Sequence, residues 1–138
     1  MNKIKSLTGK LKEKDCNGYF ISSEANISYL TGFTGDSSRL MVSPRGTALI
    51  TDGRYTEQAE MECHKDIEII TWIDDKRYQN ETYEKVCRMF EINKLCFEGN
   101  QLSYSEYLQL KKGIDKGHLE PLDGIIEEVR KIKSEREI

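Results

Sequence analysis

The chain has 138 residues, with 21 Lys and Arg against 24 Asp and Glu, and hydrophobic residues make up 37% of it. This composition suits one domain with its own core and excludes long disorder, while the formal charge of −3 argues against nucleic acid as a partner. The longest apolar run, 67–73, is far shorter than the roughly 20 residues that span a bilayer, and the basic N-terminal segment lacks a secretory apolar core. We therefore expect a cytoplasmic protein that does not bind membranes.

Apolar periodicity predicts secondary structure through the first part of the chain. A helical stripe over residues 4–14 is followed by a short strand at 18–22 and a brief helix that begins at an N-cap serine, residue 23. Two β-rich runs, 39–43 and 47–51, are separated by Pro-Arg-Gly, which predicts an antiparallel hairpin.

Helices and strands then alternate to the end of the chain. The pattern predicts helices at 55–63, 83–90, 103–113 and 125–132, and strands at 68–73, 94–98 and 118–122. Such alternation predicts an α/β fold, a mixed sheet flanked by helices with the antiparallel hairpin at its edge.

The helix at 103–113 has the clearest signals for its ends. Ser103 and Glu106 match a capping box, in which the glutamate side chain returns to the backbone of the cap. Tyr104, Tyr107 and Leu108 are predicted to form the apolar face, and Gly113 to end the helix as its C-cap.

The four cysteines, Cys16, Cys63, Cys87 and Cys96, are scattered without a Cys-x-x-Cys pair, which predicts reduced and mostly buried thiols. Cys63 precedes His64, but neighbours on a helix diverge by about 100°. We therefore interpret this pair as a core cysteine beside a surface histidine rather than as a nucleophile and its base.

Two glycine-containing segments carry the candidate functional residues. Residues 29–39 read Tyr-Leu-Thr-Gly-Phe-Thr-Gly-Asp-Ser-Ser-Arg. They fit either a helix C-cap and loop, or a surface loop that presents an aromatic ring and a guanidinium to an anionic or peptidic partner. In residues 51–55, Asp52 is predicted to cap a helix, while Arg54 either pairs with Asp52 or reaches a partner.

Residues 26–35 (NISYLTGFTG) and 48–59 (ALITDGRYTEQA) resemble the N-terminal domain of the creatinase/prolidase/aminopeptidase P family. The likeness is strongest to Xaa-Pro aminopeptidases, with Xaa-Pro dipeptidases close behind. The strand at 94–98, the segment 101–104 and the ending 129–138 fit the same pattern.

The resemblance implies a ribonuclease-H-like N-terminal domain at 1–128 and a linker at 129–138 that starts a C-terminal pita-bread domain, absent here. In the family that domain holds two divalent metals, often manganese, which activate water for attack on the peptide bond before proline. The implied partners are this catalytic domain, a second copy in a homodimer and proline-containing peptides. We expect no catalytic residue or metal ligand in this chain, which alone would be inactive, and take as contact candidates Phe33, Asp36, Ser38, Arg39, Arg54 and Tyr55.

Two alternatives remain. The chain could be a peptide- or protein-binding module from a catalytically inactive family member. A metal nuclease would need carboxylates such as Asp52, Asp74 and Glu98 to converge, and the acidic charge disfavours it. The adjacent pair Asp74-Asp75 is interpreted as a solvated loop.

Overall fold

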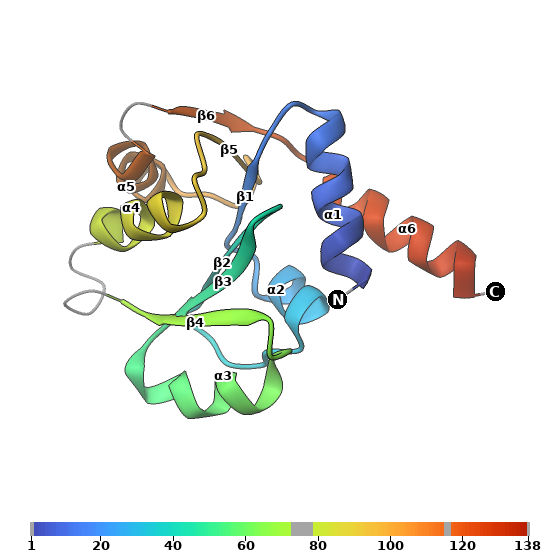
Figure 1. The fold of residues 1–138 in the computed structure, drawn as a ribbon, viewed down its shortest axis with the longest axis horizontal. Coiled ribbons are helices and arrows are strands. Elements are labelled where there is room, and N and C mark those ends of the chain that lie inside the picture. Colours follow the sequence, from blue (N-terminus) through green and yellow to red (C-terminus); the bar gives the residue numbers. More distant parts are fainter. Residues whose placement is uncertain (1, 73–78, 115–116, 138) are drawn as a thin grey trace.

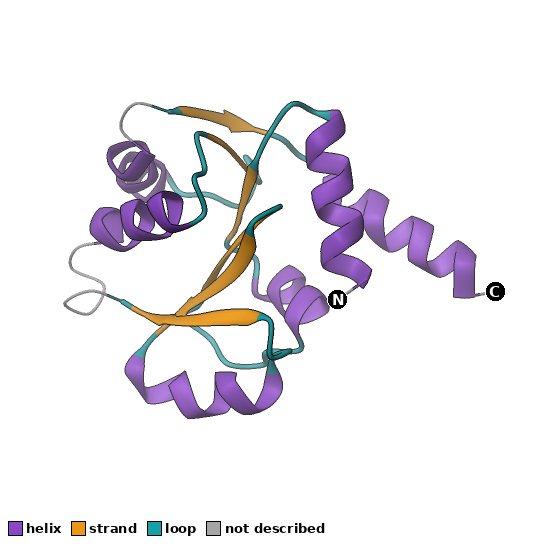
Figure 2. Cartoon of the chain, in the orientation of Figure 1, coloured by secondary structure: helices purple, strands orange, loops and turns teal. Residues whose placement is uncertain are grey.

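The computed structural model describes residues 2–72, 79–114 and 117–137. Figures 1 and 2 show helices on both sides of a twisted sheet. Every predicted helix and strand is present, although α4 begins at Gln79 instead of 83 and α6 extends to Glu137 instead of 132. The predicted end of one strand, residue 73, lies outside the described residues. The elements are α1 (Asn2–Glu13), β1 (Gly18–Ile21), α2 (Glu24–Thr31), β2 (Arg39–Ser43), β3 (Gly46–Thr51), a 3-10 turn η1 (Gly53–Tyr55), α3 (Thr56–Glu62), β4 (Ile67–Thr71), α4 (Gln79–Met89), β5 (Lys94–Phe97), α5 (Tyr104–Ile114), β6 (His118–Pro121) and α6 (Ile125–Glu137).

The six strands form one mixed sheet in the order β4-β3-β2-β1-β5-β6. Only β2 runs against its neighbours, and the other pairs are parallel. The predicted α/β sheet with a ribonuclease-H-like motif is confirmed, but the hairpin does not lie at the edge. Leu40, Met41 and Val42 are fully buried, and such a continuous apolar run needs cover on both faces, which a central strand has.

Two cores cover the two faces of the sheet. On one face α4 and α5 pack against each other and onto the strands through Tyr83, Val86 and Leu110. On the other face, the apolar stripe of α1 packs with residues of α2, α3 and α6. In Figure 1, α6 lies beside α1 and its end projects beyond the body of the domain. The predicted boundary between 128 and 129 falls inside this helix and stays a prediction.

Helix α5 differs from its predicted orientation. Tyr104 is 75% exposed and Leu108 is 38% exposed, whereas Glu106, Leu110 and Gly113 are buried. Gly113 is not a C-cap but lies inside the helix, where an added Cβ would come within 2.9 Å of the Tyr83 Cβ and 3.0 Å of the Asn80 carbonyl oxygen. Its missing side chain therefore allows α4 and α5 to approach closely.

The cysteines do not all remain thiols. Cys16 and Cys96 form a disulfide across 80 residues, with their Cα atoms 6.6 Å apart, because Cys16 precedes β1 and β1 lies beside β5. The prediction of reduced thiols is therefore wrong for this pair. Cys63 and Cys87 are free and buried as predicted, and His64 is exposed beside Asp66.

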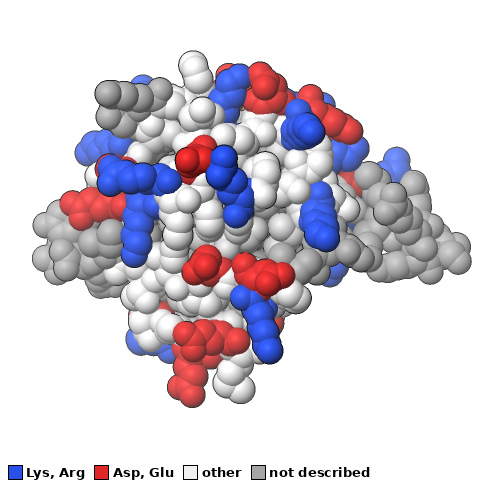
Figure 3. All heavy atoms as spheres, viewed as in Figure 1, with Lys and Arg blue, Asp and Glu red and all other residues white. Residues whose placement is uncertain are grey.

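On the face shown in Figure 3, Lys and Arg side chains are interspersed with Asp and Glu. Within the described ranges, no helix has both the length and the apolar character needed to cross a membrane.

Candidate functional site

The two candidate segments meet at one edge of the sheet. The loop 32–38 leads into β2 and the turn 52–55 follows β3, and Arg39 pairs with Ile50 across these antiparallel strands. The start of β2 therefore lies at the same edge as the ends of the parallel strands, where α/β sheets commonly bind ligands. We call this region, the side of the sheet at which the parallel strands end, the carboxyl edge.

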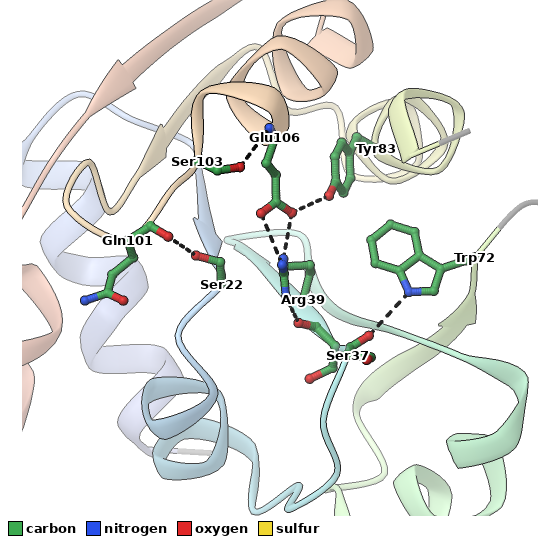
Figure 4. Close-up of polar contacts among 9 residues, drawn as sticks. Ser22, Ser37, Arg39, Trp72, Tyr83, Gln101, Ser103 and Glu106 are labelled. Atoms are coloured by element: carbon green, nitrogen blue, oxygen red, sulfur yellow. Dashed lines mark hydrogen bonds and ion pairs between the residues drawn. The ribbon is translucent and has the colours of Figure 1, made fainter. Parts of the chain in front are cut away.

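At the carboxyl edge, Arg39 forms a two-pronged ion pair with Glu106 of α5 (Figure 4). The Arg39 Nε lies 2.6 Å from Oε2 and Nη2 lies 3.1 Å from Oε1, and Arg39 Nη1 also donates to the Ser38 carbonyl oxygen. The Tyr83 hydroxyl donates to the same Glu106 carboxylate at 2.8 Å. The guanidinium is thus engaged inside the domain instead of being presented to a partner.

The ionisation of this network follows from burial and pairing. Burial opposes the charge on Arg39, but the hydrogen bond and negative charge of Glu106 outweigh it and raise the arginine pKa. Burial, together with the Glu106 charge, raises the pKa of Tyr83 far above its usual range. Arg39 therefore stays charged and Tyr83 stays a neutral donor.

The pairing with Arg39 also corrects the predicted capping box. The Ser103 Oγ accepts a hydrogen bond from the Glu106 backbone N–H at 3.1 Å, so the N-cap is confirmed (Figure 4). The Glu106 side chain does not return to the cap, because its oxygens bind a guanidinium and a phenol. Charged donors bind a carboxylate more strongly than a neutral amide does.

Phe33 and Ser38 face inward. Phe33 is 1% exposed and belongs to the core under α1 and α2, so the prediction of an exposed ring is wrong. A Cβ on Gly35 would lie 2.4 Å from the Phe33 ring, and Gly32 has φ +84° as the α2 C-cap, so both glycines of the motif have structural roles. Ser38 is fully buried, and its hydroxyl has no hydrogen-bond partner in the described part of the chain.

The remaining candidates, Asp36, Arg54 and Tyr55, lie together at the surface. Asp52 accepts hydrogen bonds from the backbone N–H of Arg54 at 2.9 Å and from its Nε at 3.2 Å, so Asp52 is the predicted cap and the first predicted partner of Arg54. A hydrogen bond with Asp36 and its negative charge raise the pKa of Tyr55, which links the loop 32–38 to the turn 52–55. We call Asp36, Arg54 and Tyr55 the polar rim.

A further carboxyl at the carboxyl edge, that of Glu98, is 6% exposed at the end of β5. Its Oε2 accepts a hydrogen bond from the Asn26 Nδ2 at 2.7 Å, while its Oε1 has no partner among the described residues. Burial, with smaller contributions from the charges of Glu127 and Asp123, raises the pKa of Glu98 to about 7, against the opposing effects of Asn26 and Arg130. From the sequence, Glu98 is a candidate only as a nuclease ligand; the signal that points to it is a carboxyl at the end of a buried strand.

The carboxylates of the nuclease alternative do not act together in the described residues. Asp52 binds Arg54, and Glu98 binds Asn26. The third, Asp74, lies outside the described residues together with Asp75. Within the described ranges, no group of three His, Cys, Asp or Glu side chains is placed to hold a metal ion.

The chain matches known proteins over almost its whole length. Residues 3–132 match the family model of the creatinase/prolidase N-terminal domain. An uncharacterized peptidase from Bacillus subtilis, YqhT, is 35% identical over 138 residues, which are 100% of this chain and 37% of that protein. An uncharacterized peptidase from Staphylococcus epidermidis is 26% identical over 143 residues, covering 100% of this chain and 39% of its own length. The chain thus spans less than half of the curated relatives that it matches.

Solved structures agree with this match. A Xaa-Pro dipeptidase from Bacillus anthracis superposes with a TM-score of 0.84 at 31% identity, over 94% of this chain and 35% of that one. A Xaa-Pro aminopeptidase structure from Streptococcus pyogenes gives a TM-score of 0.80 at 25% identity, over 94% and 95% of the two chains. The N-terminal domain of the cytoplasmic peptidase PepQ from Mycobacterium tuberculosis has the same fold, with a TM-score of 0.79 at 23% identity over 94% and 98%.

Proposed function

The chain belongs to the creatinase/prolidase N-terminal domain family, and we propose that it is the non-catalytic N-terminal domain of a Xaa-Pro metallo-aminopeptidase. The observation that carries this proposal is the coverage. The whole chain aligns with only 37% of a relative named as a peptidase, and it covers 35% of a Xaa-Pro dipeptidase structure. In this proposal, a C-terminal domain hydrolyses the peptide bond that precedes proline, and the present domain shapes the substrate site and supports a homodimer.

The chemistry of the described residues supports placing the metals elsewhere. The family resemblance implies two divalent ions, with manganese as the expected metal. Such a centre needs several carboxylate or imidazole donors aimed at one point, whereas Asp52 is paired with Arg54 and Glu98 with Asn26. The residues that the structure describes do not fit a two-metal centre, so we assign metal binding and water activation to the C-terminal domain.

The polar rim is the part of the candidate site that can contact another domain or subunit. Arg54 and Asp36 are exposed and Tyr55 is half-buried, whereas Phe33, Ser38 and Arg39 hold the loop in place from within. We propose that the rim faces the substrate site of the assembled enzyme. A cytoplasmic location, as in the name of the M. tuberculosis peptidase, is part of the same proposal.

The test is the activity of the full-length protein on X-Pro peptides, with and without added manganese. We expect metal-dependent release of the residue before proline, and comparison of dipeptides with tripeptides separates a dipeptidase from an aminopeptidase. A folded full-length protein without hydrolysis in any of several divalent metals would contradict the proposal and favour the binding-module alternative.

Variants of the polar rim test its share in the site. Arg54→Ala and Tyr55→Phe in the full-length enzyme should raise KM or lower kcat severalfold, while Lys12→Ala, an exposed change on α1, is the matched control. Exposed ion pairs contribute little to stability, so Arg54→Ala should not unfold the domain. Unchanged kinetics and unchanged dimerisation in both rim variants would remove the rim from the proposal.

A further inference from the structure

The disulfide between Cys16 and Cys96 lines a small surface cavity at the opposite edge of the sheet from the carboxyl edge. The cavity has a volume of about 150 Å³, and its walls include Lys14, Asp15, Lys94, His118 and Glu120. Cys16 is half-buried, whereas Cys96, inside β5, is 3% exposed. Cys16 is therefore the more exposed residue of the pair.

We propose that Cys16–Cys96 is a reversible redox centre that exchanges with low-molecular-weight thiols, and that Cys16 is the sulfur that forms the mixed disulfide. This inference goes beyond the proposed peptidase role, and it rests on the cytoplasmic location that belongs to that proposal. In a reducing compartment, protein disulfides are mostly transient, catalytic or redox-sensing. A bond that borders a surface cavity and includes a partly exposed cysteine fits that class better than a bond enclosed in a core.

The exchange balances without a further reactant. A small-molecule thiolate attacks the Cys16 Sγ, a new sulfur–sulfur bond forms, and Cys96 leaves as a thiolate that takes a proton from water. A second small-molecule thiolate attacks the small-molecule sulfur of the mixed disulfide and releases Cys16, which is protonated in turn. The net products are two protein thiols and one oxidised small-molecule disulfide, and the reverse sequence restores the protein bond.

The charges around the cavity allow an anionic thiolate to approach. The ammonium of Lys94 lies 2.7 Å from the Asp15 carboxylate, so these two charges compensate each other. The lining also includes the oppositely charged Lys14 and Glu120, and His118 borders the cavity as well. This mixed lining gives no net repulsion of an incoming anion.

The structure also keeps the two sulfurs close after reduction. Asn17 holds the end of the α1–β1 turn against β5, because its backbone N–H donates to the Lys94 carbonyl oxygen at 3.1 Å and its Oδ1 accepts from the Lys94 N–H at 2.9 Å. The buried stripe Ile4, Leu7 and Leu11 holds α1 on the sheet independently. The reduced domain should therefore stay folded, with its thiols placed to form the bond again.

The other two cysteines serve as internal controls. Cys63 and Cys87 are buried and free, and burial raises the pKa of the Cys87 thiol to about 12 and also raises that of Cys63. Thiols of this kind react slowly because the thiolate is scarce and covered.

The experiment titrates the 138-residue chain in buffers of reduced and oxidised glutathione, followed by rapid alkylation and peptide mass spectrometry. We expect a Cys16–Cys96 link in oxidising buffer and its complete loss in reducing buffer, while Trp72 fluorescence stays that of the folded protein. Two results would overturn the proposal: thiols that stay unlinked in oxidising buffer, or a link that only urea unfolding makes reducible.

Single variants test which sulfur reacts. In Cys96→Ser, oxidised glutathione should modify Cys16 at least about tenfold faster than it modifies Cys96 in Cys16→Ser, because Cys16 is the more exposed of the two residues. Equal rates in the two folded variants would refute the assignment of Cys16. If a variant fails to fold, the wild-type chain decides, because the glutathione-bearing peptide identifies the residue that was attacked.

Discussion

The buried carboxyl of Glu98 should make the stability of this domain fall as the pH rises, and Glu98→Gln should remove that fall. In the folded chain its pKa is about 7, against an ordinary value of 4.5, chiefly because of burial. Between these two values the folded state holds a proton that the unfolded state has released. The free energy of unfolding therefore decreases with pH across that window, and the stability present below pH 4.5 is lost by about pH 7.

The size of the effect follows from the same two values. At about 1.36 kcal/mol per pH unit, the interval from 4.5 to about 7 corresponds to at most about 3 kcal/mol. Glutamine keeps the shape and the acceptor for Asn26 but carries no charge at any pH. At pH 8, Glu98→Gln should be more stable than the wild type by roughly 2 to 3 kcal/mol, and the gain should largely vanish at pH 4.

Urea unfolding followed by the fluorescence of Trp72, the single tryptophan, measures both proteins from pH 4 to pH 8. Glu128→Gln, an exposed change on α6, is the control and should follow the wild-type curve. If the curves of Glu98→Gln and the wild type run parallel over the whole pH range, the reasoning from burial is wrong.

Three further changes test the packing. Gly113→Ala should destabilise the domain by about 1 to 3 kcal/mol, because its Cβ would lie 2.9 Å from the Tyr83 Cβ; a neutral result in thermal unfolding would contradict the close approach of α4 and α5. Arg39→Ala should cost about 2 to 4 kcal/mol by leaving the Glu106 carboxylate buried without its cationic partner, and adding Glu106→Gln should recover part of that loss; additive losses in urea unfolding would argue against the ion pair. Phe33→Ala should cost about 3 to 5 kcal/mol, as expected for a core ring, and a loss under 1 kcal/mol would restore the exposed ring.

Local sequence patterns predicted most of the helices and strands of the fold. The N-cap at Ser23, the turn between the hairpin strands and the alternating periods depend on residues close in sequence, and all of them predicted the observed elements. The order of the strands did not follow from these patterns, and the hairpin lies within the sheet instead of at its predicted edge.

Contacts between distant residues were not predictable in the same way. Glu106 has a capping-box spacing, yet its partner is Arg39, 67 residues earlier in the chain. Cys16 and Cys96 meet across 80 residues only because β1 and β5 are neighbours. From the sequence alone Phe33 is an aromatic residue in a loop, and only the three-dimensional structure shows that its ring lies in the core. The signal missing in each case is the partner, which no local spacing contains.

The central position of β2 has a consequence for folding during synthesis. Residues 2–72 contain β1, β2, β3 and β4 with three helices of one face, so this part can assemble before the rest of the chain has left the ribosome. The opposite face, with Phe20, Met41 and Ile50, stays uncovered until α4 and α5 emerge. During that interval the nascent chain exposes an apolar surface that is prone to aggregation. We expect a ribosome-associated chaperone to shield this surface.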